Sequence, residues 1–334
     1  MEASDLKKYL ERAASTTGLQ EIRIRAGQPV FLIIDGAEWV LGEQGLLSGS
    51  GAKTAPRAEK RILKELLEIF ARHSLYAYED EIRQGFLTIE GGHRVGLCGK
   101  TVLEGDKVRT IKEISSLNIR ITHEKKGCAD AVFPYLFENG GLVNTLLVSP
   151  PGAGKTTMLR DMIRQVSDGS RHEPGRSVAV VDERSELAAC FLGQPQCDLG
   201  MRTDVLDGCP KAVGMMMAIR SMAPYAVAVD EIGTKEDLEA LRQASNCGCR
   251  ILATVHGSSV FDLTNKPVIS EMVREKVFGR YVVLGKSPHP GTAIGIYDEN
   301  RRELINDEVS WDCADGRVLN RGRFPRGRAP AGAV

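Results

Sequence analysis

The first third of the chain alternates hydrophobic and polar residues, which is typical of strands with one buried face. The alternating hydrophobic positions are Ile22, Ile24, Val30, Leu32 and Ile34. Turn-forming residues interrupt them at 27–29 and 35–36. A set at helical spacing follows: Ile62, Leu63, Leu66, Leu67 and Phe70. Residues 1–125 are therefore predicted to form a small α+β domain, with a mobile Gly/Ser-rich loop at 42–57.

After Gly141 the pattern changes to short hydrophobic runs that alternate with helical segments. The runs expected to be strands are 142–149, 177–187, 225–233, 250–257, 281–284 and 291–297. Helical spacing appears at 157–166 and 214–222. Strands that alternate with helices indicate a mainly parallel sheet covered by helices. Residues 126–312 are predicted to form this α/β domain.

A chain of 334 residues, 42% hydrophobic and 26% charged, is large enough for two globular domains. Its formal net charge is zero, so the chain as a whole gives no electrostatic argument for binding nucleic acid or anionic lipid. Residues 313–334 differ, because five arginines lie there among Gly, Pro and Ala. We expect a disordered basic tail that is a solvated chain end, with contact to nucleic acid or acidic lipid as the alternative.

The cysteine spacing and the start of the chain bear on its location. Eight cysteines are scattered and only Cys247 and Cys249 lie close together, so we expect the reduced thiols of a cytoplasmic protein. Residues 1–15 have the pattern of a charged amphipathic helix and not of a signal peptide. No hydrophobic run approaches the roughly 20 residues of a membrane-spanning helix. Attachment to a membrane would therefore need a partner protein.

The segment 142–159 combines a hydrophobic strand, a loop rich in Gly and Pro, and a helix. The loop resembles the Walker A pattern, in which backbone amides surround phosphates, the lysine contacts the β and γ phosphates, and the hydroxyl binds Mg²⁺. Ser149 replaces the first Gly of that pattern, and a small residue can still turn out of a strand. The predicted phosphate-binding residues are Ser149, Pro150, Pro151, Gly152, Ala153, Gly154, Lys155, Thr156 and Thr157. A strand-to-helix turn without a ligand is the alternative.

Two acidic residues, Asp230 and Glu231, lie near the end of the predicted strand at 225–233. In P-loop nucleoside triphosphatases an acidic residue at the end of a buried strand holds Mg²⁺, and Asp230 fits this Walker B role together with Thr156. Glu231 is then placed to orient or deprotonate the attacking water. Two adjacent buried carboxylates are unfavourable without a cation, so a metal ion suits this pair. A solvated strand end is the alternative.

Polar residues also end two other predicted strands. Asp182 and Glu183 could face the same Mg²⁺ and water, or could cap a helix that starts at Ser185. His256 could sense the γ-phosphate by hydrogen bonding, or could be structural. All these residues are expected at the carboxyl edge of the sheet, where doubly wound sheets bind their ligands.

Several arginines could contact a phosphate across a domain or subunit boundary. Those on predicted strands of the first domain are Arg23, Arg25, Arg94, Arg109 and Arg120, with a solvated strand face as the alternative for each. Arg202 and Arg220 are further candidates. Arg220 lies in the methionine-rich helical segment 214–222, which is either a core helix or an exposed face that binds a partner.

The order of these motifs resembles the secretion ATPase superfamily of type II, type IV pilus and type IV systems. The matching segments are the Walker A motif at 149–157, an acidic box at 182–183, the Walker B motif at 225–231 and a histidine box at 252–256. A closer resemblance, over about residues 18–312, is to the stage III sporulation protein AA family of endospore-forming bacteria. The segments that carry it are VDERSELAAC, RTDVLDGCPKAVGMMMAIRSMAP, VDEIGTKED and SLYAYEDEIRQGFLTIEGGHRVGLCGK.

This resemblance implies an ATPase core of the RecA/AAA-like, secretion ATPase type that binds ATP and Mg²⁺. The catalytic residues would be Lys155, Asp182, Glu183, Glu231 and His256. It also implies a homo-oligomer, hexameric by resemblance, in the mother-cell cytoplasm. Membrane-embedded channel proteins that link mother cell and forespore would hold this ring at the membrane, and hydrolysis would drive it as a motor.

Two departures from the secretion motors leave the phosphate-contacting arginine open. Those motors carry Gly-Glu where this chain has Asp230-Glu231, and Ile-Arg-Asp where it has residues 232–234. Two other functions remain as alternatives. One is a nucleic-acid-associated ATPase that uses the basic tail and strand arginines, and the other is a nucleotide-gated scaffold that hydrolyses little ATP.

Overall fold

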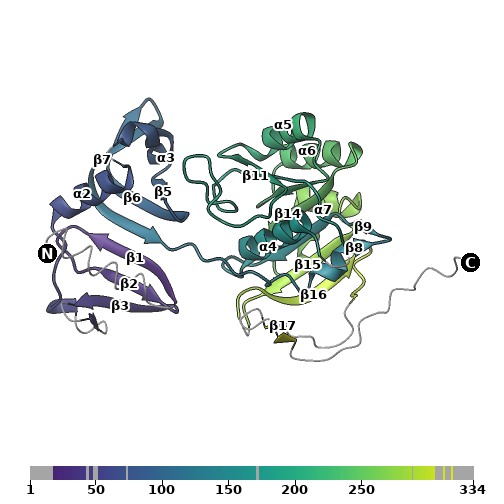
Figure 1. Ribbon diagram of the computed structural model, residues 1–334, viewed down its shortest axis with the longest axis horizontal. Coiled ribbons are helices and arrows are strands. Elements are labelled where there is room, and N and C mark those ends of the chain that lie inside the picture. Colours follow the sequence, from purple (N-terminus) through teal and green to yellow (C-terminus); the bar gives the residue numbers. More distant parts are fainter. Residues whose placement is uncertain are drawn as a thin grey trace, which may run out of the picture. The chain divides into compact units, whose positions relative to one another are not determined.

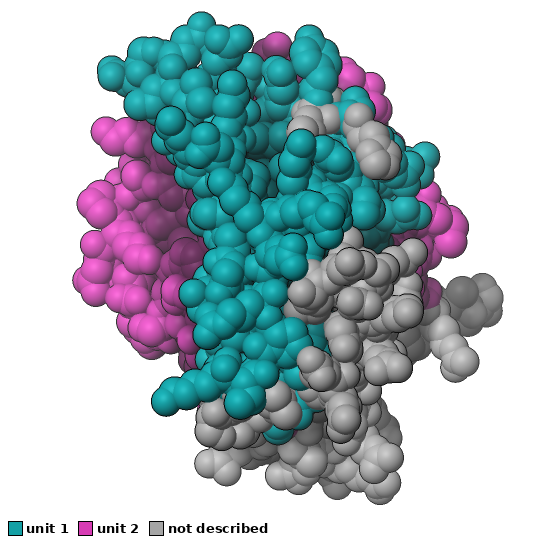
Figure 2. Space-filling view, turned by 90° about the vertical axis from the view of Figure 1, so that its left-hand side faces the viewer, with its two compact units in different colours: residues 1–123, 189–197 teal, residues 124–188, 198–334 magenta. Residues whose placement is uncertain are grey.

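The computed structural model describes residues 18–42, 45–47, 52–72, 74–170, 173–287, 289–304, 311–312 and 317–318. The expected N-terminal helix at 1–15 and most of the expected basic tail lie outside these residues. The chain forms two compact units, one of residues 1–123 with 189–197 and the other of residues 124–188 with 198–334 (Figure 2). The sequence prediction left 189–197 in the second domain, whereas the structure places this segment in the first unit.

The first unit is built on a seven-stranded antiparallel sheet in the order β4-β3-β2-β1-β7-β6-β5 (Figure 1). Its strands are β1 Leu19–Arg25, β2 Phe31–Ile34, β3 Ala37–Gly42, β4 Gly45–Leu47, β5 Phe86–Ile89, β6 His93–Glu104 and β7 Lys107–Arg120. Its helices are α2 Lys60–Phe70, η2 Leu75–Tyr78 and α3 Glu79–Arg83. The alternating residues predicted for β1 and β2 are buried and share one core with Ile62 and Leu63 of α2, which confirms that part of the prediction.

Residues 189–197 join this first unit from a distant part of the sequence. Phe191 is only 8% exposed and belongs to the core of the unit. The Arg72 guanidinium lies 4.8 Å from the centre of its ring. The Gln196 side chain accepts a hydrogen bond from the Gly91 amide at 3.0 Å. Nonpolar burial and a hydrogen bond therefore hold the segment in this unit.

The second unit contains a seven-stranded sheet in the order β12-β11-β13-β14-β10-β15-β16, parallel except for β16. Its strands are β10 Thr145–Ser149, β11 Val178–Asp182, β12 Thr203–Asp207, β13 Ala226–Val229, β14 Arg250–His256, β15 Arg280–Gly285 and β16 Thr292–Asp298. Its helices are η3 Phe133–Leu136, α4 Lys155–Asp168, α5 Lys211–Met222, α6 Lys235–Asn246, η4 Asp262–Asn265 and α7 Pro267–Arg274. Two short pairs complete it, β8 Phe137–Glu138 with β9 Gly141–Leu142 and β17 Trp311–Asp312 with β18 Arg317–Val318.

Helices cover both faces of this second sheet, as in an α/β fold. One face shares a core with α5, α6 and α7, to which alternate strand residues such as Val148, Val229 and Val255 contribute. Helix α4 contacts β10, β11, β12 and β14 and has its own buried residues, among them Met158 and Leu159 (Figure 1). The predicted α/β domain with a mainly parallel sheet is therefore confirmed.

Two predicted strands end earlier than expected, and several elements were not expected. The strand predicted at 177–187 ends at Asp182, where the chain enters a loop. The strand predicted at 225–233 ends at Val229, and Glu231 has a positive φ of 53°, outside the strand region. Among the unexpected elements are strand β12 and helices α6 and α7. Strand β12 has no clear hydrophobic period, whereas α7 has buried nonpolar residues at helical spacing, Ile269, Met272 and Val273, which the prediction did not use.

Candidate nucleotide-binding site

Four neighbouring parallel strands bring the predicted site residues to one edge of the second sheet. Ser149 of β10 pairs with His256 of β14. Val181 of β11 pairs with Val229 of β13, so the residues that follow each of them, including Asp182 and Asp230, emerge next to each other. The carboxyl ends of parallel strands are where such sheets bind ligands. The register therefore gathers the four motifs that the sequence had singled out.

The loop between β10 and α4 has the backbone that a phosphate-binding loop needs. Gly152 and Gly154 have φ of 71° and 79°, in the left-handed region that favours glycine. A Cβ on Gly154 would lie 2.9 Å from the Gly291 amide nitrogen, so a side chain has no room there. Ser149 is the buried last residue of β10, and extended backbone at that position accepts an L residue in place of the usual Gly.

Lys155, the first residue of α4, lies between the two acidic residues that follow β13. Its ammonium is 3.0 Å from Asp230 Oδ1 and 3.1 Å from Glu231 Oε1, and its side chain is only 7% exposed. The Thr156 hydroxyl donates to Asp230 Oδ2 at 2.9 Å. Two oxygen donors, one of them an ionised carboxylate, are thus adjacent at the mouth of the loop. Hard oxygen ligands of this kind fit Mg²⁺.

The electrostatics of the site favour ionised carboxylates. Burial pushes the pKa of Asp230 upward, but the Lys155 charge and hydrogen bonds from Thr254, Lys155 and Thr156 bring it below its ordinary value. Glu231 behaves in the same way: burial raises its pKa, and Lys155 and His256 lower it further than burial raises it. Both residues can therefore carry negative charge at neutral pH, as a cation ligand and a proton acceptor require.

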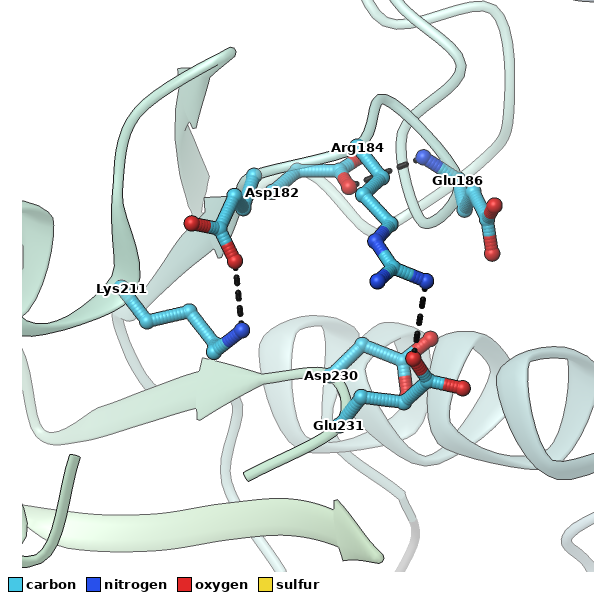
Figure 3. A pocket seen from close by; sticks show the side chains of 7 residues that line it. Asp182, Arg184, Glu186, Lys211, Asp230 and Glu231 are labelled. Carbon is cyan, nitrogen blue, oxygen red and sulfur yellow. Dashed lines mark hydrogen bonds and ion pairs between the residues drawn. The ribbon is translucent and has the colours of Figure 1, made fainter. Parts of the chain in front are cut away.

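Glu231 has two more cationic or potentially cationic partners. His256 Nε2 lies 2.6 Å from Glu231 Oε1, and His256 Nδ1 is buried without a hydrogen-bond partner in the described part of the chain. Arg184, from the loop after β11, donates to Glu231 Oε2 at 3.0 Å. Figure 3 shows the Arg184 guanidinium pointing toward the two carboxylates. The Glu231 carboxylate is thus contacted at both oxygens.

Asp182 has a different environment from the one expected for a helix cap. No helix starts at Ser185, and residues 183–202 form turns and loop. The Asp182 carboxylate instead accepts hydrogen bonds from the amides of residues 186, 187 and 188, at 2.8–2.9 Å. Burial nevertheless raises the pKa of Asp182 to about 6. The main contacts of Asp182 thus organise the loop after β11.

Glu183 is held by a residue that the sequence analysis did not consider. Lys211, the first residue of α5, forms an ion pair with its carboxylate and is 14% exposed. Both residues line a pocket with Asp182, Arg184, Glu186, Asp230 and Glu231 (Figure 3). Glu183 therefore lies at the site, with its charge compensated by Lys211.

The predicted arginine candidates have partners close by in their own units. Arg23 and Arg120 pair with Glu21, Arg94 lies 3.6 Å from the centre of the Phe86 ring, and Arg25 lies 6.0 Å from that of Phe31. Arg202 donates to the Ser167 carbonyl at 2.9 Å. Of the remaining candidates, Arg109 lies in the first unit and Arg220 lies on α5. Arg184, which was not among the predicted candidates, contacts the predicted site residue Glu231.

Sequence reasoning missed three contributors to the site, Arg184, Lys211 and Thr254. They lie inside segments that carry the family resemblance, but nothing in the residue types assigns them a role, and their contacts depend on which strands are neighbours in the sheet. A capping-box signal for the start of α6 was present in the sequence. Thr234 is followed three residues later by Asp237, and the two form this capping box in the structure. The secretion motors carry Ile-Arg-Asp where this chain has residues 232–234, and in this chain Thr234 caps the start of α6.

Comparison with known proteins agrees with this architecture. The sequence profile of the family described as "Sporulation stage III, protein AA" matches residues 1–304. The chain is 42% identical over 286 residues to "Stage III sporulation protein AA" of Bacillus subtilis (strain 168), covering 86% of this chain and 89% of the relative. The family resemblance predicted from the sequence is thereby confirmed.

Two solved structures have a similar fold. The ATPase DotB of Legionella pneumophila is similar with a TM-score of 0.57 and 16% identity, covering 85% of this chain and 76% of that one. The pilus retraction motor PilT with bound ADP is similar with a TM-score of 0.55 and 15% identity, covering 84% and 77%. At these identities the similarity concerns the fold alone, and it agrees with the predicted α/β fold.

Proposed function

Since this chain belongs to the stage III sporulation protein AA family, we propose that it hydrolyses ATP at the carboxyl edge of its second sheet. One observation carries the proposal: Lys155 and Thr156, which begin the helix after a glycine loop, directly contact Asp230 and Glu231. The predicted Walker A and Walker B residues are thus in direct contact. That arrangement is suited to a triphosphate and a divalent cation.

The phosphates would be held by the loop at 150–154 and the start of α4. Backbone amides of the loop and the positive end of the helix dipole attract anions. Lys155 would exchange its two carboxylate partners for the β and γ phosphates, which removes the ammonium from Asp230 Oδ1 and Glu231 Oε1. The ion pairs of Lys155 place its ammonium at the mouth of the loop, where the phosphates would bind.

Thr156 and Asp230 would hold Mg²⁺, because their oxygen atoms already lie 2.9 Å apart. When bound, the ion would offset the negative charge of the phosphates. The low pKa of Asp230 keeps its carboxylate ionised and available for this role at neutral pH.

Glu231 would act as the general base. The oxygen of a water molecule forms a bond to the γ-phosphorus, the bond from that phosphorus to the β–γ bridging oxygen breaks, and a water proton passes to the Glu231 carboxylate. ADP and phosphate are the products. His256 and Arg184 would orient Glu231, because each contacts one of its two carboxylate oxygens. Lys211 and Asp182 would maintain the neighbouring loop.

We further propose a homo-oligomeric ring in the mother-cell cytoplasm, hexameric by analogy with secretion motors, that energises a channel complex through membrane-embedded partners. The support is the sporulation family and the motor-like fold. In the described part of the chain, no helix is both long and nonpolar enough to cross a bilayer. Light scattering after gel filtration, with and without ATP, tests the ring, and a monomer in both conditions at micromolar concentration would contradict it.

Glu231→Gln tests the activity. The variant should bind ATP like the unaltered protein and hydrolyse it about 10²–10⁴-fold more slowly, because the base is lost while the phosphate contacts remain. Glu239→Gln is a matched control, since Glu239 is exposed on α6 and should leave the rate unchanged. Hydrolysis by Glu231→Gln at the unaltered rate would contradict the proposal, as would Lys155→Ala binding ATP as tightly as the unaltered chain.

A further inference from the structure

Thr254 links the two acidic residues of the site through a single hydroxyl. It is fully buried in β14, two residues before His256 and between β10 and β13. Its Oγ1 hydrogen-bonds to Asp230 Oδ1 and also to the Glu231 amide, the latter at 2.8 Å. One side chain therefore contacts the carboxylate of one residue and the backbone of the next.

The direction of these two hydrogen bonds is fixed by chemistry. An ionised carboxylate can only accept a hydrogen bond and an amide N–H can only donate one. The single Thr254 proton must then go to Asp230, and the hydroxyl oxygen must accept from the Glu231 amide. The hydroxyl uses its proton and a lone pair in a buried place, where water cannot replace either partner.

The same contacts set which Asp230 oxygen is available. Oδ1 receives the Thr254 hydroxyl and the Lys155 ammonium, and Oδ2 receives the Thr156 hydroxyl. Rotation of the carboxylate is thereby opposed from both sides. The oxygen next to Thr156 is held where the proposed cation would be shared between Asp230 and Thr156.

Thr254 also stabilises an unusual backbone at Glu231. Glu231 has a φ of 53°, a left-handed conformation that is unfavourable for a residue with a side chain. The Thr254 hydroxyl accepts from the amide of Glu231, and the Thr254 carbonyl accepts from the amide of Ile232 at 2.9 Å. Two successive amides are thus anchored on one residue of the neighbouring strand. This anchoring directs the Glu231 side chain toward Lys155 and His256.

We propose that Thr254 is a positioning residue that aligns the Mg²⁺ ligand Asp230 and the base Glu231 together. This inference rests on the proposed function. It goes further because it ties cation binding and proton transfer to one hydroxyl, that of Thr254, which lies outside both the Walker A and the Walker B motif. Loss of that hydroxyl should impair both steps, whereas binding of nucleotide without the cation should change little.

A second threonine of the same sheet provides a matched control. Thr145 is also fully buried, on β10, and its hydroxyl donates to the Val143 carbonyl at 2.8 Å, away from the acidic residues. Thr254→Val and Thr145→Val each remove one buried hydroxyl and keep a β-branched side chain of similar volume. Thr254→Ser restores the hydroxyl and loses only a methyl group.

The first measurement needs no ligand. Hydrogen exchange of the nucleotide-free protein, followed by mass spectrometry on peptides that contain residues 230–233, reports on the two anchored amides. Thr254→Val should accelerate exchange there by about tenfold or more, as expected when a hydrogen bond to a buried group is lost. Thr254→Ser and Thr145→Val should leave these peptides within about twofold of the unaltered protein.

The second measurement follows a fluorescent ATP analogue in EDTA and in rising Mg²⁺, together with steady-state hydrolysis. For Thr254→Val, half-saturation with Mg²⁺ should need about tenfold more cation and kcat should fall about tenfold or more, since hydrogen bonds to charged groups are the stronger ones. Binding in EDTA should change less than about twofold, and Thr254→Ser should recover most of both losses.

Three outcomes would overturn the proposal. One is unaltered exchange at 230–233 in Thr254→Val, the second is an unaltered Mg²⁺ dependence and rate, and the third is an equal effect of Thr145→Val on either. If the unaltered protein neither binds nor hydrolyses ATP, the proposed function fails instead. The exchange experiment on nucleotide-free protein would then still decide whether Thr254 holds residues 230–232.

Discussion

Replacing Lys155 by methionine would leave two carboxylates without their shared cation. Asp230 is 14% exposed and Glu231 is 28% exposed, so water can compensate Glu231 better than Asp230. Methionine keeps the unbranched shape of the lysine stem, so the change removes charge with little loss of volume. The nucleotide-free protein should become less stable, even though Lys155 is placed to bind a ligand.

The magnitude follows from the burial of the pair. Removing one partner of a buried ion pair is destabilising by about 3–5 kcal/mol, because the remaining charge is uncompensated. Lys155→Met should approach this range. Asp230→Asn should lose less, about 1–3 kcal/mol, because Lys155 still has Glu231 as a partner. The variant that carries both Lys155→Met and Asp230→Asn should be about 2 kcal/mol more stable than the sum of the two single losses in unfolding free energy predicts.

Hydrogen exchange is the suitable assay, since the protein has two units and a single unfolding curve would mix them. Peptides covering β10 and β13 report on the sheet that carries the pair. Exchange of β1 and β2, in the other unit, serves as an internal control and should not change. The unaltered protein, the two single variants and the double variant form a double-mutant cycle and are compared without nucleotide at low and high salt. The effect of salt should be small because the pair of Lys155 and Asp230 is buried.

Additive losses in this cycle would refute the reasoning. They would mean that Lys155 does not contact Asp230 in the nucleotide-free protein, and the description of an ion-paired resting site would be wrong. Increased stability of Lys155→Met would refute it as well, because the two adjacent carboxylates would then not need a cation.

Two further predictions concern the loop and the acidic box. Gly154→Ala should weaken ATP binding, measured by calorimetry, by about tenfold or more, because φ at this position is 79° and a Cβ would lie 2.9 Å from Gly291 N. Gly233→Ala, which meets no atom within 4 Å, is the control, and equal binding by both variants would contradict the prediction. The pKa of Asp182 is about 6, above its ordinary 3.8, so the folded state binds this proton more tightly than the unfolded state. Stability from this group is then greatest below the unfolded pKa and falls as pH rises through 6, by about 1.4 kcal/mol between about pH 5 and about pH 8. Asp182→Asn should flatten that part of the pH profile when urea unfolding is followed by hydrogen exchange of peptides from the second sheet, and identical profiles would contradict the assignment.

The sequence was sufficient for the parts of the site that depend on local order. Lys155 and Thr156 follow a glycine loop, and Asp230 follows a hydrophobic run, so a strand, a loop and a helix could be assigned from spacing alone. The expectation that Asp182, Asp230 and His256 lie at one edge needed only the rule that parallel strands end together. The register of the sheet agrees with it.

The rest depends on which strands are neighbours, and hydrophobic spacing does not contain that information. Thr254 contacts Asp230 because β14 pairs with β13, and Arg184 reaches Glu231 because β11 is on the other side of β13. Asp182 was considered as a helix cap because its carboxylate and the following Ser185 fit that pattern. Its three amide partners in a loop could be found only in the structure.

The chain passes from the first unit to the second at residue 124, and the loop after β11 adds two more crossings, near 189 and near 198. A shortened protein that starts at residue 124 would still contain Phe191, whose ring is buried by residues that such a protein lacks. It would therefore expose a nonpolar, aggregation-prone surface, and weak activity in that fragment would not be informative about the ATP site. Dissection of this protein into its parts should exchange residues 189–197 for a short polar linker before the two halves are expressed separately.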